Sequence, residues 1–212
     1  MIKVIESLEL TPNGVRLGNT QKVHLRQGEL DGACAVYSLM MYLIILRIFT
    51  HKQVIVGNDI KRSTSKGRII REFLEKQNGL IRKGLNFAND IREGLQYAAK
   101  KIVECDYIPT RQETIEALAE CIDNNKPLMI GVDYNKIDGH ALLAIGYEIR
   151  NNKIKKIFCL DPGSDIDSTS YWNAIITLDV YANTKYRDSY LTADGVIKKV
   201  TLADAIKIEK KK

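Results

Sequence analysis

The sequence predicts an α+β fold, in which a mostly helical first half is followed by an antiparallel sheet. Up to about residue 125, apolar residues recur at helical spacing; beyond it, short apolar segments alternate with turn signals. The 212 residues, 45% hydrophobic and 27% charged, suffice to bury a core without disulfides or a metal. We therefore expect a single domain over 1–212, with a helical half at about 33–125 and a sheet half at about 127–208.

The most distinctive predicted helix is the apolar run at 33–46, ACAVYSLMMYLIIL. It contains neither Pro nor Gly, which predicts a helix buried on all sides. It is shorter than the ~20 residues that span a bilayer, so no membrane insertion is expected. Two short strands around the turn Pro12-Asn13-Gly14 and an extended loop at 17–33 should precede it.

Further elements follow from periodicity and turn signals. Helices are expected at 66–77 and 86–103, and a third runs from Thr110 to about 124, opened by a capping box with Glu113. Strands are expected at 128–134, 139–149, 153–160, 172–181 and 194–202, with the final EKKK frayed.

One predicted hairpin brings two chemical groups together. If strands 139–149 and 153–160 pair about a two-residue Asn151-Asn152 turn, His140 lies opposite a residue near 163. Asp161 is then within a couple of residues of His140. A carboxylate in that place can fix the tautomer of an imidazole and stabilise the imidazolium.

A candidate nucleophile precedes this hairpin. Cys34 opens the buried helix, where unpaired backbone N–H groups and the helix dipole favour a thiolate. Gln27 lies in the loop before it and carries an amide that could donate to a developing oxyanion, with Gln21 as a remote substitute. His24 shares this loop and is a rival base, although it and His51 are expected to be exposed.

The other cysteines lack this context. Cys105, Cys121 and Cys159 are expected to be packing residues. The four cysteines include no CxxC pair and are too sparse for a disulfide scaffold, and the three scattered histidines form no metal-ligand pattern. With no signal peptide at the amino terminus, these features predict free thiols in a reducing, cytoplasmic compartment.

The net charge of +6 is concentrated in one region. Residues 51–105 carry 12 basic and 6 acidic side chains, most of the basic ones within 61–83. The simplest interpretation is the solvated side of an amphipathic helix. Nucleic acid is not expected, because no aromatic residues interleave with the basic ones, whereas an acidic partner at 61–83 stays open.

Three segments, in order, resemble the papain-like cysteine peptidase superfamily, most closely bacterial members such as bacteriocin-processing peptidase domains and effector proteases. They are QGELDGACAVYSLMMYLI, GHALLAIGY and CLDPGSD. The resemblance implies a papain-like fold, with a central buried helix that carries the cysteine and packs against an antiparallel sheet. It implies Cys34 as nucleophile, His140 as general base and acid, and Asp161 as the orienting residue. Gln27 and the backbone N–H of Cys34 would form the oxyanion hole, although Gln27 lies seven residues before the cysteine rather than the usual six.

The sequence therefore predicts a thiol hydrolase, in the first place a cysteine peptidase that acts through an acyl-enzyme on a peptide or protein and needs no cofactor. Two alternatives stay open. The same site could deamidate glutamine, transfer an acyl group or cleave an isopeptide bond. Alternatively, the chain could be a non-catalytic binding module on a papain-like fold.

Overall fold

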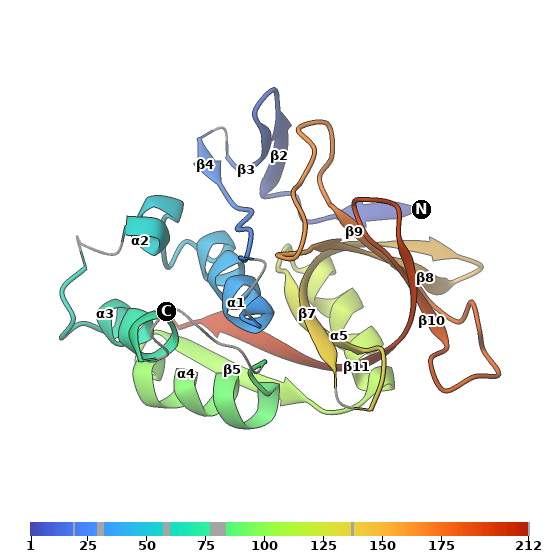
Figure 1. Cartoon of the computed structure of the whole chain (residues 1–212). Coiled ribbons are helices and arrows are strands. Elements are labelled where there is room, and N and C mark those ends of the chain that lie inside the picture. Colours follow the sequence, from blue (N-terminus) through green and yellow to red (C-terminus); the bar gives the residue numbers. More distant parts are fainter. Residues whose placement is uncertain (19, 29–31, 57–59, 77–83, 137, 212) are drawn as a thin grey trace.

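The chain folds as a ring of antiparallel strands with helices packed beside it (Figure 1). This computed structural model describes residues 1–18, 20–28, 32–56, 60–76, 84–136 and 138–211. Within those ranges, no helix combines the length and the apolar character needed to cross a membrane.

In the described residues, six strands make up the ring. They are β6 (Leu128–Asp133), β7 (Gly139–Arg150), β8 (Lys153–Leu160), β9 (Ala174–Thr177), β10 (Asp188–Leu191) and β11 (Ile197–Lys210). They pair in the order β7-β6-β11-β10-β9-β8, and β8 pairs back onto β7, so the sheet closes into a barrel.

Shorter strands extend this core. β1 (Ile2–Val4) pairs with β7, and β5 (Val103–Ile108) pairs with β11. The strands β2 (Leu8–Thr11), β3 (Gly14–Leu17) and β4 (Gln21–Lys22) form a small separate sheet. The helix expected at 86–103 ends earlier than predicted, at Ala99, and β5 follows it from Val103.

The expected α+β, papain-like fold, with a buried helix packed against an antiparallel sheet, is wrong, because the strands close into a barrel. Two features that the sequence pattern did not reveal complete the ring. β10 is a four-residue strand of mixed polarity, and β11 continues past the predicted end at 202, so that Ala205 and Ile206 pair with β6. The early part of β11 pairs with β10 and its middle part with β6, across an irregularity between Leu202 and Ala205. β11 thereby joins the two sides of the ring.

The hairpin of β7 and β8 has the expected turn and the expected register at both ends. Leu143 pairs with Leu160, and Arg150 pairs with Lys153, whereas the register between them shifts by one residue between Glu148 and Ile149 and shifts back between Ala144 and Gly146. Asn151 and Asn152 have φ values of 51° and 56°, the positive φ that a two-residue type I′ turn requires at both positions. The hairpin therefore brings the start of β7 beside the end of β8.

The helix predicted at 33–46 is confirmed as α1 (Cys34–Ile45), which is buried along almost its whole length. It packs against β6 and β7. Ser38 Oγ donates to the carbonyl of Ala141 in β7, and the Tyr42 hydroxyl bonds the backbone of Ile208 in β11. These buried polar contacts fix the position of the helix on the barrel.

The remaining helices lie mainly before the barrel strands in the chain. α2 (His51–Val56) was not predicted, and α3 (Ser65–Ile70) continues into a π-helical turn, η1 (Arg71–Glu75). A second such turn, η2 (Phe87–Ile91), precedes α4 (Arg92–Ala99). The capping box is confirmed at the start of α5 (Arg111–Asp123), where Thr110 Oγ1 accepts from the Glu113 N–H.

The basic stretch 61–83 is described as far as residue 76, and 77–83 lie outside the described residues. Its apolar side, formed by Ile69, Ile70 and Phe73, is buried. On its basic side, Arg62 pairs with Glu75 and Lys76 pairs with Glu72. The acidic partner stays a prediction.

Candidate active site

Cys34 is the first residue of α1, and its side chain meets the start of β7. The N-cap residue, Ala33, makes no side-chain capping bond, so the first-turn N–H groups receive no such partner. The N–H of Ala141 donates to Cys34 Sγ at 3.4 Å, and the N–H of Ala35 also bonds the sulfur. Both donors stabilise a thiolate.

His140 and Asp161 meet at the open end of the β7–β8 hairpin, as the register predicts. His140 Nε2 lies 2.6 Å from Asp161 Oδ1, with 12% of the His140 side chain and 2% of the Asp161 side chain exposed. Such a short bond between largely buried groups is a charge-assisted interaction.

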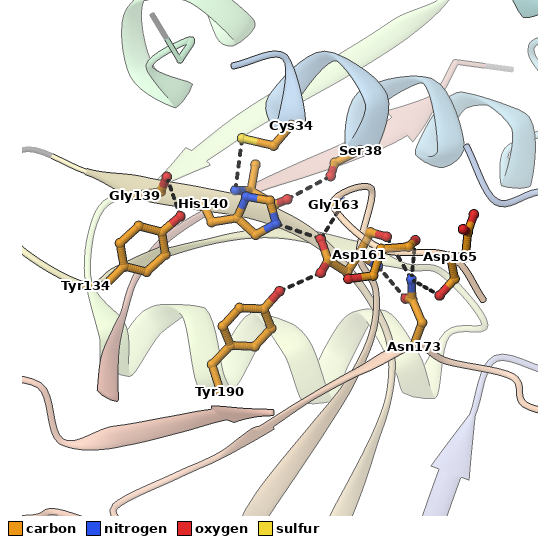
Figure 2. A network of polar contacts seen from close by, with 12 residues as sticks. Cys34, Ser38, Tyr134, Gly139, His140, Asp161, Gly163, Asp165, Asn173 and Tyr190 are labelled. Carbon is orange, nitrogen blue, oxygen red and sulfur yellow. Dashed lines mark hydrogen bonds and ion pairs between the residues drawn. The ribbon is translucent and has the colours of Figure 1, made fainter. Parts of the chain in front are cut away.

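The imidazole of His140 lies beside the thiol of Cys34, close enough for hydrogen bonding and charge to shift the pKa of both groups. Since Nε2 is engaged by Asp161, the nitrogen left for the thiol is Nδ1. Figure 2 shows His140 between Cys34 and Asp161. The structure thus brings together three residues that lie far apart in the sequence.

The pKa values of the pair move in opposite directions. Burial alone would raise the pKa of Cys34, but the hydrogen bond and charge of His140 and the two backbone N–H groups hold it below its ordinary value. Burial alone would lower the pKa of His140, but its bonds to Asp161 and Cys34 raise it to about 9. Together these shifts favour a thiolate beside an imidazolium.

A dense set of donors surrounds Asp161. Its Oδ1 also accepts from the Gly163 N–H at 2.7 Å, and its Oδ2 accepts from the Tyr190 hydroxyl at 2.5 Å. The amide of Asn173 accepts from the Asp161 N–H at 2.7 Å and donates to the Asp161 carbonyl at 2.8 Å. Burial would raise the pKa of Asp161, but the bonds from His140, Tyr190 and Gly163 hold it below its usual range.

Sequence reasoning missed Tyr190 and Asn173. Both lie in segments with no motif, and both reach Asp161 through strands that follow β8: β9 pairs with β8, and β10 pairs with β9. Asn173 follows a turn after β8, and Tyr190 lies in the short strand β10.

His24 is buried, not exposed as predicted, with 4% of its surface accessible. Its Nε2 donates to the Asp161 carbonyl at 2.9 Å. Burial is the main cause that lowers the pKa of His24, so this imidazole is neutral and supports the backbone of Asp161. This position argues against His24 as the base for Cys34. His51, also expected to be exposed, is half-buried.

Gln27 lies in the same cleft as Cys34 and His140. This cleft, of about 610 Å³, is also lined by Phe87 and Tyr134. The Gln27 N–H donates to the Pro162 carbonyl at 2.8 Å, which ties the loop to the segment after β8. Among the described residues, its Oε1 is buried without a hydrogen-bond partner.

Gln21, the substitute considered for Gln27, is engaged elsewhere. Its Nε2 donates to the Phe49 carbonyl at 3.2 Å.

The other three cysteines contrast with Cys34. All four are free thiols, and burial raises the pKa of Cys105 to about 12 and of Cys121 to about 11. Burial raises the pKa of Cys159 well above its ordinary value. Cys34 is thus the cysteine whose surroundings favour the thiolate. A search of the described residues for three or more side chains able to hold a metal found none.

Comparison with known proteins gives a structural likeness but no match of sequence. No protein-family model and no curated protein sequence matches the chain. The chain is similar to the crystal structure of UfSP from C. elegans, with 13% sequence identity and a TM-score of 0.43, over 100% of this chain and 34% of that one. The chain therefore spans about a third of the length of that protein, and a likeness this weak carries no argument about fold or activity. The bacterial branch suggested by the sequence stays a prediction.

Proposed function

We propose that this chain is a thiol hydrolase, in the first place a cysteine peptidase, with Cys34 as nucleophile, His140 as general base and acid, and Asp161 as orienting residue. The observation that carries the proposal is that Cys34 and His140 line the same cleft, where the N–H of Ala141, the residue after His140, bonds the sulfur, and that His140 bonds the buried Asp161 carboxylate at 2.6 Å. A nucleophile bonded to a base, which is itself oriented by a third group, is the arrangement that covalent catalysis requires.

In the proposed reaction, the Cys34 thiolate attacks a peptide carbonyl and the C–S bond forms. The oxyanion accepts hydrogen bonds from the Cys34 N–H and from the Gln27 amide. The C–N bond then breaks as the His140 imidazolium gives its proton to the leaving amine, and a thioester is left on Cys34. His140 next takes a proton from water, whose oxygen attacks the thioester. The C–S bond then breaks and the acid is released, which leaves Cys34 as the thiolate beside the imidazolium of His140.

The substrate in this proposal is a peptide or protein, which would occupy the cleft that Cys34, His140 and Gln27 line. Every group used in the proposed steps belongs to this chain, so the proposal includes no cofactor. It also includes a reducing compartment such as the cytoplasm, because an oxidised Cys34 could not attack.

The first test is alkylation of Cys34 by iodoacetamide across pH, followed residue by residue by mass spectrometry. In the wild type, Cys34 should react well below the pH at which Cys105 reacts. In His140→Ala this advantage should disappear, whereas the control His51→Ala should retain it. The proposal would be falsified if Cys34 were inert, or reacted like an ordinary thiol regardless of His140.

The second test decides between hydrolysis and its alternatives at the same site. Deamidation, acyl transfer and isopeptide cleavage use the same nucleophile and base and differ in the acyl donor or acceptor. A trapped acyl-enzyme on Cys34, with the mass of the group released from it by water or by an added amine, identifies the reaction.

The proposed hydrolase is favoured over a non-catalytic binding module by one specific arrangement. A binding module has no need for a thiol beside an imidazole that a buried carboxylate fixes, yet Cys34 and His140 line the same cleft and Asp161 bonds His140 at 2.6 Å. A module would bind a peptide equally well after Cys34→Ala and would yield no acyl-enzyme.

A further inference from the structure

We propose that Tyr190 is a positioning residue, whose hydroxyl holds the Asp161 carboxylate in the orientation that meets His140. This inference rests on the proposed function and adds to it a fourth residue outside the predicted set. Figure 2 shows Tyr190 approaching Asp161 from the side opposite to Asn173.

The first step of the argument is the way that donors are divided between the carboxylate oxygens. Oδ1 of Asp161 accepts from His140 and from the Gly163 N–H, at 2.6 and 2.7 Å. Oδ2 accepts from the Tyr190 hydroxyl at 2.5 Å. With Asp161 only 1% exposed, solvent has little access to replace that hydroxyl. The Tyr190 bond therefore opposes rotation of the carboxylate away from His140.

The second step is the position of Tyr190 itself, which is 2% exposed and lies in β10. His140 and Asp161 lie on the hairpin of β7 and β8, so Tyr190 reaches them from a different strand of the closed barrel. Its ring centroid lies 6.2 Å from that of His140. Tyr190 thus contacts both members of the pair it would align.

The third step is the anchoring of β10, because a positioning group must itself be fixed. Asp188, two residues before Tyr190, is fully buried. It accepts from the guanidinium of Arg111 at 2.9 Å and from the N–H groups of Asp179 and Leu202 at 2.9 and 3.0 Å. These bonds tie the start of β10 to the adjoining segments of the chain.

The fourth step is the protonation state of the hydroxyl. Burial and the neighbouring Asp161 carboxylate raise the pKa of Tyr190, so it stays a donor across the working range of pH. A permanent donor on Oδ2 leaves Oδ1 to accept from His140. Removing the hydroxyl would leave Oδ2 buried without this donor, and the carboxylate would then turn or shift to find another.

The test is the isosteric change Tyr190→Phe, with the pKa of His140 followed by NMR of the imidazole and alkylation of Cys34 measured across pH. If the hydroxyl positions Asp161, the pKa of His140 should fall by about one unit, because the imidazolium loses its aligned partner. The alkylation rate of Cys34 on the acid side of its titration should fall about tenfold, because the thiolate is then less stabilised.

The matched control is Tyr42→Phe, which removes another buried hydroxyl, the one that bonds the backbone of Ile208. It should lower stability and leave the titration of His140 unchanged. The proposal is overturned if Tyr190→Phe leaves the pKa of His140 unchanged, or if Tyr42→Phe lowers it equally. It is also overturned if Tyr190→Phe raises that pKa, because the hydroxyl would then only have drawn charge away from the carboxylate.

A measurement on the wild type covers the case in which Tyr190→Phe does not fold. The proton of a hydroxyl whose oxygen lies 2.5 Å from a buried carboxylate oxygen should be slow to exchange and should resonate far downfield in the proton NMR spectrum. Its absence overturns the inference. Failure of the proposed function is separate, because it would appear as equal reactivity of Cys34 in wild type and His140→Ala.

Discussion

His140 Nε2 lies 2.6 Å from Asp161 Oδ1 because one residue begins β7 and the other directly follows β8. The two residues are 21 positions apart in the sequence, and the hairpin with its turn at 151–152 brings them together. Within the hairpin the register shifts by one residue between Glu148 and Ile149 and shifts back between Ala144 and Gly146. The turn and these two compensating irregularities together determine the geometry of the charge pair.

The first prediction concerns the pH dependence of turnover. The reactive form is the thiolate of Cys34 with the imidazolium of His140. The pKa of Cys34 is lowered, so activity should appear at a pH below the ordinary titration of a thiol. The pKa of His140 is raised to about 9, so activity should fall as the pH rises through about 9, where the proton needed by the leaving group is lost. Initial rates from pH 4 to 11 check both limbs.

Two results would contradict this prediction. An alkaline limb near pH 6.5 would mean that His140 titrates as an isolated imidazole. A profile that rises to pH 10 without falling would mean that no group has to donate a proton.

The second prediction is that Asp161→Asn damages the site more than its small size suggests. The carboxylate accepts on both oxygens, from His140 and Gly163 on one side and from Tyr190 on the other. An amide offers one acceptor and one donor, so its NH₂ group must face a donor in a buried place. We expect a loss of about 1–3 kcal/mol in the free energy of unfolding.

The same substitution should move the alkaline limb of the pH profile. Without the negative charge, the imidazolium of His140 is less stable, so its pKa should fall below about 9. Urea denaturation and the pH profile measure the two effects separately. Asp165→Asn, which changes an exposed carboxylate paired with Arg26, is the control and should change neither. An Asp161→Asn variant of wild-type stability with an unmoved limb would refute the prediction.

The third prediction concerns Asn173, whose amide bonds both backbone groups of Asp161 and the Ser164 carbonyl, at 2.7, 2.8 and 2.9 Å. Asn173→Ala leaves these groups without that partner in a buried place, so the free energy of unfolding should fall by about 2 kcal/mol. Alkylation of Cys34 should also slow, because the backbone that carries Asp161 is less fixed. Thermal denaturation and the alkylation assay check the two results.

The control for Asn173 is Asn124→Ala. Its amide also bonds a backbone carbonyl, that of Glu120, but at an exposed helix end. Its loss should cost less than about 0.5 kcal/mol, because water replaces the bond. Equal costs for the two substitutions would show that burial does not set the energetic importance of Asn173.

The parts of this structure that could be predicted from the sequence depend on local patterns. The apolar run after Cys34 has no polar face, and it forms the buried helix. The capping box at Thr110 and the turn at 151–152 need only residues a few positions apart. The turn then brings His140 near Asp161, although the two compensating irregularities inside the hairpin could not be predicted from it.

The parts that could not be predicted depend on contacts between distant segments. β10 is too short to show a period, and the lysine-rich end of β11 becomes a strand only because β5 pairs with it. β10 joins the ring by pairing with β9 and β11, and the contact of Tyr190 with Asp161 depends on those pairings. His24 was expected in solvent because its neighbours are polar, and it is buried because Asp161 offers its carbonyl.

The last prediction distinguishes the role of Gln27 from the roles of Cys34 and His140. Gln27 lines the cleft with Cys34 and His140, and the proposed role of its amide is to bond the oxyanion. That charge develops only during attack on a carbonyl, so Gln27→Ala should lower the acylation rate by about 10²–10³. Alkylation of Cys34 by iodoacetamide forms no oxyanion and should stay within about twofold of the wild type. Pre-steady-state acylation by an ester substrate, run beside the alkylation assay, measures both rates.

Gln21→Ala is the control, because the Gln21 amide bonds the Phe49 carbonyl, and this substitution should affect neither rate. A Gln27→Ala variant that slows both reactions equally would assign Gln27 to holding the loop rather than to the oxyanion.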